Sequence, residues 1–180
     1  MNRVILTPAA LPGAALAELK QWLGITTTGD DTPLLSLLTT ALEVCEGFTG
    51  QMPLETECEE VLPARAGWHT LSTRSVLAIS GAEIVAADGS RSPLDATAYE
   101  IDLDADGTGR IRLPDTDARV AVRFTAGLAS DWTQLPETLR HGLTRLAAHQ
   151  HRERESEGAA PLPPASVAAL WRPWRRMHLA

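Results

Sequence analysis

The sequence predicts an α+β fold: a small helical bundle with an inserted antiparallel β module and a C-terminal segment that is part helix and part extended tail. Two observations predict this class. Apolar residues recur every three or four positions near both ends of the chain, as in amphipathic helices, whereas short extended runs with hairpin-turn signals fill the middle. We expect a body over residues 1–163, with the β module at about 55–126, and a tail over residues 164–180.

The first two elements are predicted to be helices. One covers about Ala14 to Leu23, and Gly24 ends it. The next begins at Thr32-Pro33, because Thr is a favoured N-cap residue and Pro fits the first helical position. It runs as far as Gly50, and its apolar stripe consists of Leu34, Leu38, Ala41, Cys45 and Phe48.

The middle of the chain is predicted to be antiparallel β structure. Asp88-Gly89 is a hairpin-turn signal, and residues 104–109 form a looser one. Apolar side chains alternate with other residues over 120–124, as in a strand with one buried face. The expected strands are Glu57–Leu62, His69–Leu71, Gly81–Ala86, Tyr99–Leu103, Arg110–Leu113 and Arg119–Ala126.

The chain is predicted to return to helix after the β module. A helix starts at Leu135-Pro136-Glu137 and reaches about Glu155, with Leu139, Leu143, Leu146 and Ala147 on its buried face. A further helix starts near Pro164. Pro173 cannot donate the helical hydrogen bond, so this helix should end or kink near Trp171 and continue as an extended basic hook.

Composition favours a soluble globular protein. Hydrophobic residues make up 44% of the chain and charged residues 22%, and no apolar run approaches the roughly 18 residues of a membrane helix, so no membrane contact is expected. The apolar run before Pro8 is too short for a secretory signal. Cys45 and Cys58 match neither a CxxC pair nor a zinc ligand set, and we expect free, buried thiols in a reducing compartment.

Charge is distributed unevenly along the chain. Residues 1–139 carry 9 Lys and Arg against 20 Asp and Glu, whereas residues 140–180 carry 7 against 3. An acidic body with a basic end suggests electrostatic complementarity between copies or with a partner. The alternative is that these are simply solvated charges.

Motifs for catalysis or metal binding are weak. Asp102, Asp104 and Asp106 match the start of a calcium-binding loop, but position twelve is Leu113, so an acidic hairpin turn is the better interpretation. The histidines at 141, 149 and 151 do not share one helix face and are interpreted as surface residues. No nucleophile motif or glycine-rich phosphate loop occurs. We expect no enzyme activity, no cofactor and no metal.

The C-terminal segment is the strongest candidate for a binding site. Trp and Arg dominate the energetic centres of protein interfaces, and the predicted partner-binding residues are Trp171, Arg172, Trp174, Arg175 and Arg176. Two alternatives remain. The arginines could contact DNA phosphates while a tryptophan stacks on bases, or the segment could pack on the chain's own core through Val167, Leu170, Trp171 and Trp174.

Two patterns together carry a family resemblance that spans nearly the whole chain. They are the opening Lys20-Gln-Trp-Leu, Asp30-Asp31 and Glu43-x-x-Glu46, and the closing Ala168-Ala-Leu-x-x-Pro-x-Arg-Arg176. With these patterns the chain resembles the head–tail connector (adaptor) proteins of long-tailed phages and of phage-derived gene transfer agents. The β insertion is larger here than in the smallest members of that family.

The resemblance implies a structural protein at the head–tail interface of a virion or phage-like particle, assembled in the bacterial cytoplasm. It implies a ring, in twelve copies where it follows portal symmetry, that docks beneath the portal protein and joins it to a neck or tail-completion protein. The C-terminal segment would reach the portal, and DNA would pass through a channel with acidic walls without sequence-specific binding. The alternative function is a DNA-binding accessory protein that uses the same basic tail.

Overall fold

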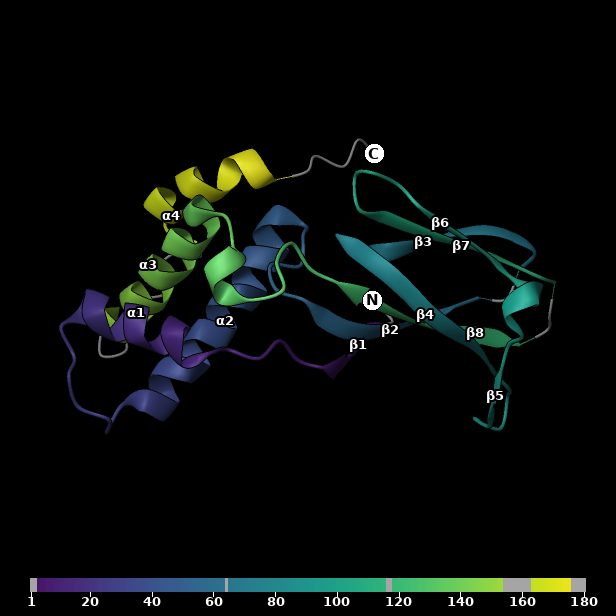
Figure 1. Cartoon of the computed structure of the whole chain (residues 1–180), viewed down its shortest axis with the longest axis horizontal. Helices are drawn as coiled ribbons and strands as arrows, with labels where there is room; N and C mark the ends of the chain where they lie inside the picture. Colours follow the sequence, from purple (N-terminus) through teal and green to yellow (C-terminus); the bar gives the residue numbers. More distant parts are fainter. Residues whose placement is uncertain (1–2, 64, 116–117, 154–162, 176–180) are drawn as a thin grey trace. The chain divides into compact units, whose positions relative to one another are not determined.

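A computed structural model of the chain describes residues 3–63, 65–115, 118–153 and 163–175. The chain divides into two compact units. A β unit comprises residues 1–9 and 55–127, and a helical unit comprises residues 10–54 and 128–180. Figure 1 shows helices in one unit and strands in the other, so the predicted α+β fold class is confirmed.

Four α-helices lie in the described part of the helical unit. They are α1 (Gly13–Leu23), α2 (Asp31–Thr49), α3 (Glu137–Glu153) and α4 (Ala165–Trp171), with 3₁₀ turns η2 (Trp132–Gln134) and η3 (Arg172–Trp174). Helix α3 packs against each of the other three helices. The core of the helical unit contains fully buried leucines at the predicted three- and four-residue spacing, together with Trp132, Val167 and Trp171.

The helix ends follow the local sequence signals, but the predicted start of α2 was wrong: its N-cap residue is Asp30, two residues before Thr32, and Pro33 lies inside the first turn, where its missing N–H costs no helical hydrogen bond. Gly24 and Gly50 end α1 and α2 with left-handed backbones, at φ values of 73° and 72°, which glycine adopts without steric cost. Helix α4 ends at Trp171, as Pro173 predicts. The 3₁₀ turn then intervenes, and the backbone becomes extended only at Arg175, three residues later than the sequence suggested.

Two antiparallel sheets form the β unit. The larger has the order β1-β2-β8-β4-β5 and the smaller the order β3-β7-β6. Buried side chains in this unit include Cys58, Leu71, Ile111, Val120 and Phe124. The strands are β1 (Arg3–Thr7), β2 (Thr56–Leu62), β3 (Gly67–Arg74), β4 (Val76–Val85), β5 (Arg91–Pro93), β6 (Glu100–Leu103), β7 (Thr108–Leu113) and β8 (Arg119–Ala126), and a 3₁₀ turn, η1 (Ala96–Ala98), precedes β6.

The six predicted strands are all present, and β8 has the predicted bounds. Both predicted turns join neighbouring strands, β4 to β5 and β6 to β7. Two strands, β1 and β5, were not expected. Strand β5 is only three residues long, too short to show an alternating pattern of its own, although the predicted turn at Asp88-Gly89 joins it to β4. Strand β1 lies more than forty residues before its partner β2, so it has no local hairpin signal.

Candidate functional site

The predicted C-terminal site is built on a buried tryptophan. Trp171, the last residue of α4, is fully buried, and its indole Nε1 donates a hydrogen bond to the carbonyl oxygen of Leu139 on α3 at 3.3 Å. Its ring centroid lies 6.1 Å from that of Phe48 on α2. Trp171 therefore anchors α4 inside its own helical unit.

Gly142 makes this anchor possible. A Cβ atom at position 142 would lie 2.2 Å from Nε1 of Trp171 and 2.8 Å from its Cε2, which is far inside ordinary van der Waals contact. The missing side chain thus leaves the space on α3 that the indole fills. Sequence reasoning did not single out Gly142, although an isolated glycine inside a helical pattern is a known sign of close packing.

The turn after α4 is fixed by two further contacts. Trp174 is half-buried, and its Nε1 donates to the hydroxyl of Thr138 on α3 at 2.9 Å. Its backbone carbonyl accepts a hydrogen bond from the side-chain amide of Gln51 at 2.5 Å. These bonds hold residues 172–174 against α3 and the end of α2.

The arginines of this segment differ from its tryptophans. Arg172 and Arg175 are exposed. The guanidinium of Arg175 lies 5.5 Å from the ring centroid of Phe48, a distance at which a cation is attracted to the face of an aromatic ring. Arg176, the fifth predicted residue, lies outside the described residues. The exposed guanidinium groups of the segment thus lie next to aromatic side chains that pack on the helical unit. Contact of the segment with a partner stays a prediction.

This arrangement also bears on the two alternatives for the segment. Val167 and Trp171 are buried and Leu170 and Trp174 are half-buried, so packing on the chain's own core is observed. Stacking of Trp171 on a nucleic-acid base would require its removal from that core. Base stacking in the described segment would therefore fall to Trp174, whose indole Nε1 already donates to Thr138.

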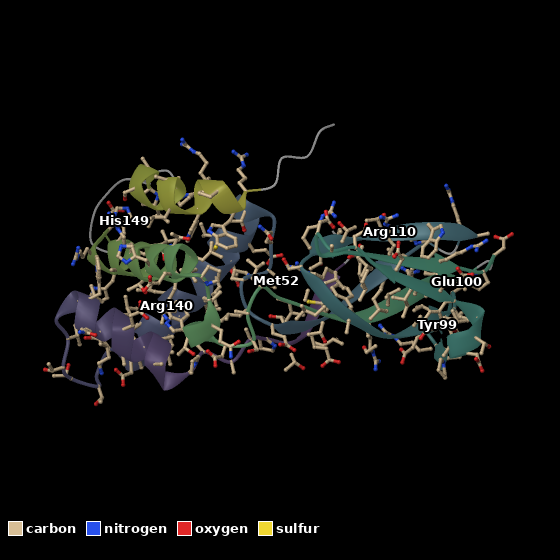
Figure 2. All side chains as sticks on the ribbon, turned by 45° about the horizontal axis from the view of Figure 1, so that its top comes forward. Met52, Tyr99, Glu100, Arg110, Arg140 and His149 are labelled. Atoms are coloured by element: carbon tan, nitrogen blue, oxygen red, sulfur yellow. The ribbon has the colours of Figure 1, made fainter. Side chains whose placement is uncertain are left out.

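Helix α3, against which the C-terminal segment packs, is linked to α1 through the carboxylate of Glu18. Glu18 on α1 accepts hydrogen bonds from Trp132 Nε1 at 2.9 Å and from the Thr144 hydroxyl at 3.3 Å. Arg140 on α3, labelled in Figure 2, lies 3.6 Å from the same carboxylate. Since donors from η2 and α3 converge on it, Glu18 fixes the position of α3 within the helical unit.

The histidines and the acidic turn that the sequence singled out have neighbours within their own units. His141 meets the edge of Trp22 at 5.2 Å between ring centroids, and His149 lies 2.9 Å from Glu153. Arg110 on β7 (Figure 2) pairs with Asp104 and lies 3.8 Å from Asp102, which agrees with the acidic-turn interpretation. In the described ranges, no group of three or more His, Cys, Asp or Glu residues could hold a metal ion.

The β unit contains a charge cluster on its larger sheet. Arg91 pairs with both carboxylate oxygens of Glu59, at 2.7 and 2.9 Å, and Arg123 bridges Glu59 and Glu83 at 3.4 and 3.1 Å. The hydrogen bond from Arg91 is the largest cause of a lowered pKa at Glu59. Because the arginines satisfy a carboxylate that is largely buried, the cluster ties β2, β8, β4 and β5 together.

Among known proteins, only solved structures match this chain. No family model and no curated protein matches the chain. A chain of the "Neck of empty GTA particle computed with C6 symmetry" is 28% identical, with a TM-score of 0.78 over 98% of this chain and 97% of that one. A chain of the "Virion of native gene transfer agent (GTA) particle" is 29% identical, with a TM-score of 0.78 over 100% and 98%.

A third match is to the "Neck of native GTA particle computed with C12 symmetry". It is 29% identical, with a TM-score of 0.75 over 98% of this chain and 97% of that one. The predicted resemblance to connector proteins of phage-derived gene transfer agents is thereby confirmed. The matches support a structural component of a particle neck and a ring-forming oligomer, and they favour a non-enzymatic role. Over the part of the chain that the structure describes, no helix has the length and apolarity to cross a bilayer.

Proposed function

We propose that this protein is a head–tail connector (adaptor) that forms a ring beneath the portal of a phage-like particle and joins the capsid to the neck and tail. One observation carries the proposal: the similarity to particle and neck chains covers both units and almost every residue of the chain. Similarity of that extent supports a common role for the whole chain, because it is not confined to one of the two units.

The proposed portal contact is the C-terminal segment that carries Trp171, Arg172, Trp174, Arg175 and Arg176. Trp171 acts as the internal anchor, because its burial against Leu139 and Phe48 fixes the start of the turn. The exposed guanidinium groups of Arg172 and Arg175 then extend from a backbone that Gln51 and Thr138 hold in place. A pre-ordered turn binds with a smaller entropy cost than a free tail, and arginine forks suit carboxylates on the portal.

The ring is proposed to have twelve copies and to surround the DNA path. Heterologous contacts between identical subunits generate such closed rings. The acidic excess over residues 1–139 supports a channel with negative walls, because like charges prevent DNA from adhering as it passes. The opposite face of the ring would meet a neck or tail-completion protein. Assembly is proposed to take place in the bacterial cytoplasm before the particle is released.

The portal contact can be tested by charge reversal at the exposed arginines. Arg172→Glu/Arg175→Glu should lower affinity for purified portal rings at least tenfold, because carboxylates on the portal would then meet like charges. The melting temperature should stay within a few degrees, since neither side chain is buried. The matched control, Arg119→Glu/Arg152→Glu, makes the same charge change at two other exposed arginines.

Co-sedimentation with portal rings and electron microscopy of the mixtures would measure the outcome. A charge-reversed protein that loads onto portals as the control does would remove the proposed role of this segment. Salt-dependent binding of the isolated wild-type protein to duplex DNA, lost in the same double variant, would instead favour the DNA-binding accessory function.

A further inference from the structure

The β unit has sheet edges that differ in how well they are protected. Strands β1 and β5 lie at the ends of the larger sheet, and β3 and β6 lie at the ends of the smaller one. An edge strand presents backbone N–H and C=O groups to any extended segment that can pair with them, so proteins protect edges that should stay single. The edges that lack protection are candidates for assembly.

Several edges of this unit are blocked. Strand β5 has only three residues and ends at Pro93, which has no N–H. On β3, the N–H of Ser72 donates to both carboxylate oxygens of Glu60 at 3.1 and 3.0 Å. The first half of β4 extends beyond β5, but its pairing with β8 contains two register shifts, and such irregularities discourage further strand addition.

Strands β1 and β6 have the opposite character. Arg3 to Ile5 pair regularly with Glu60 to Cys58 before a register shift, so one side of this stretch is in the sheet and the other side is an edge. Both strands carry large aliphatic side chains that are between 41% and 55% exposed. These side chains are Val4, Ile5 and Leu6 on β1 and Ile101 and Leu103 on β6.

We propose that β1 of one copy pairs with β6 of the next copy, so that sheets of adjacent subunits join around the ring. The two strands have similar lengths, five and four residues. The strands carry opposite charges, because β1 contains Arg3 whereas β6 contains Glu100 and Asp102. These groups also interact within their own unit, Arg3 with Thr73, Glu100 with Arg112 and Asp102 with Arg110, so charge would orient the two strands and backbone pairing would hold them. Pairing would also place aliphatic side chains of the two strands beside one another on the faces of the joined sheet, which reduces their exposure.

The geometry suits a ring because the two edges are different surfaces. Contact between unlike surfaces is heterologous and can close into a cycle, whereas self-pairing of β1 would stop at a dimer. The occupant of each edge is thus a second copy of this chain. The inference rests on the ring in the proposed function, to which it adds the contact between neighbouring subunits.

Cysteine cross-linking of the full-length protein tests the pairing directly. Chains carrying Val4→Cys with either Ile101→Cys or Leu103→Cys sample two registers, and a disulfide forms only where the two Cβ atoms come within about 4.5 Å. The native thiols of Cys45 and Cys58 are buried and do not interfere. Under mild oxidation at up to millimolar protein, we expect at least one double variant to give a ladder of dimers, trimers and larger species on non-reducing gels.

The single-cysteine variants are the matched controls. Val4→Cys alone lacks the second thiol and should give no species beyond a dimer. A ladder that is absent from both double variants at every concentration would overturn the inference. Equally efficient cross-linking by Val4→Cys alone would also overturn it, because that result would mean that β1 pairs with itself.

A second measurement blocks the edge instead of linking it. Val4→Lys/Ile5→Lys should weaken self-association at least tenfold in analytical ultracentrifugation, because lysines on an edge strand oppose strand addition. Leu77→Lys is the control, since Leu77 is similarly exposed but lies on the irregular half of β4. Equal association of the two variants would contradict the inference.

Failure of this inference can be distinguished from failure of the proposed function. Wild-type protein that loads onto portal rings but never cross-links through β1 and β6 would refute the strand pairing and leave the connector role intact. Protein that cross-links as a ladder but does not bind portals would support the pairing and refute the connector role.

Discussion

Alanine at position 142 should loosen the C-terminal segment from the helical unit. Glycine in a helix interior is ordinarily less stable than alanine by about 0.5–1 kcal/mol, so a free site would gain stability from this change. Here the new Cβ would lie 2.2 Å from Nε1 of Trp171. The indole is rigid and fully buried, so either α3 and α4 move apart or the ring leaves its site.

The size of the effect follows from these competing terms. Overpacking a well-packed core costs about 1–3 kcal/mol and occasionally more. Complete loss of a buried tryptophan costs about 3–5 kcal/mol, which sets the upper limit. A contact of 2.2 Å with a fully buried ring belongs at the upper end of the overpacking range. After the helix gain is subtracted from a cost of about 3 kcal/mol, we expect Gly142→Ala to lower the free energy of unfolding by about 2 kcal/mol.

Urea unfolding followed by circular dichroism at 222 nm measures this change. Gly47→Ala is the matched control, because Gly47 also lies inside a helix, is exposed, and has no atom within 4 Å of the position of a new Cβ. It should be stabilised by about 0.5–1 kcal/mol. The two alanine variants should therefore shift the urea midpoint in opposite directions.

A double-mutant cycle identifies the cause of the loss. In the background Trp171→Ala the clash is absent, so adding Gly142→Ala should cost nothing and should recover the ordinary helix gain. If Gly142→Ala stabilises the wild-type protein as Gly47→Ala does, or if its cost persists without the indole, the assignment of Gly142 as the site that accommodates Trp171 is refuted.

Three further predictions concern buried and turn residues. Arg91 and Arg123 hold the pKa of Glu59 below its ordinary value of 4.5, so the ionised carboxylate stabilises the fold above that pH. Glu59→Gln should therefore lower the free energy of unfolding by about 1–3 kcal/mol at pH 7. Urea unfolding at several pH values should show the difference from wild type shrinking as the pH falls through the lowered pKa. Burial raises the pKa of Cys45 to about 12, so iodoacetamide at pH 8 should label this thiol only after the protein unfolds. Peptide mass spectrometry measures the labelling, and equal labelling rates for native and unfolded protein would contradict this prediction. Gly107 has a φ of 79°, and a new Cβ there would lie 2.9 Å from the Cα of Ser75. Gly107→Ala should therefore destabilise the protein by about 2 kcal/mol or more, as measured by thermal unfolding. Gly89→Ala is the control, because Gly89 has a similar φ but open space around it, and it should cost only about 1–2 kcal/mol.

Signals within short stretches of the sequence predict most of the secondary structure. Apolar periodicity and glycine caps place α1 within a residue of its observed ends and α2 within two, and the alternation over 120–124 places β8. These signals are local, because side-chain burial on one face and left-handed glycine caps act within a few residues. The ordering of elements and the closing Trp and Arg pattern also sufficed for the family resemblance, which the structural matches confirm.

The position of the C-terminal segment depends on contacts between distant parts of the chain. Its helix and the proline that ends it are local features, but the site for Trp171 is made by Gly142 and Leu139 on another helix and by Phe48 on a third. Strand β1 was missed for the same reason, since it pairs with residues more than forty positions away. Packing between distant segments depends on side-chain volume and backbone pairing in space, and these have no signature within one stretch of sequence.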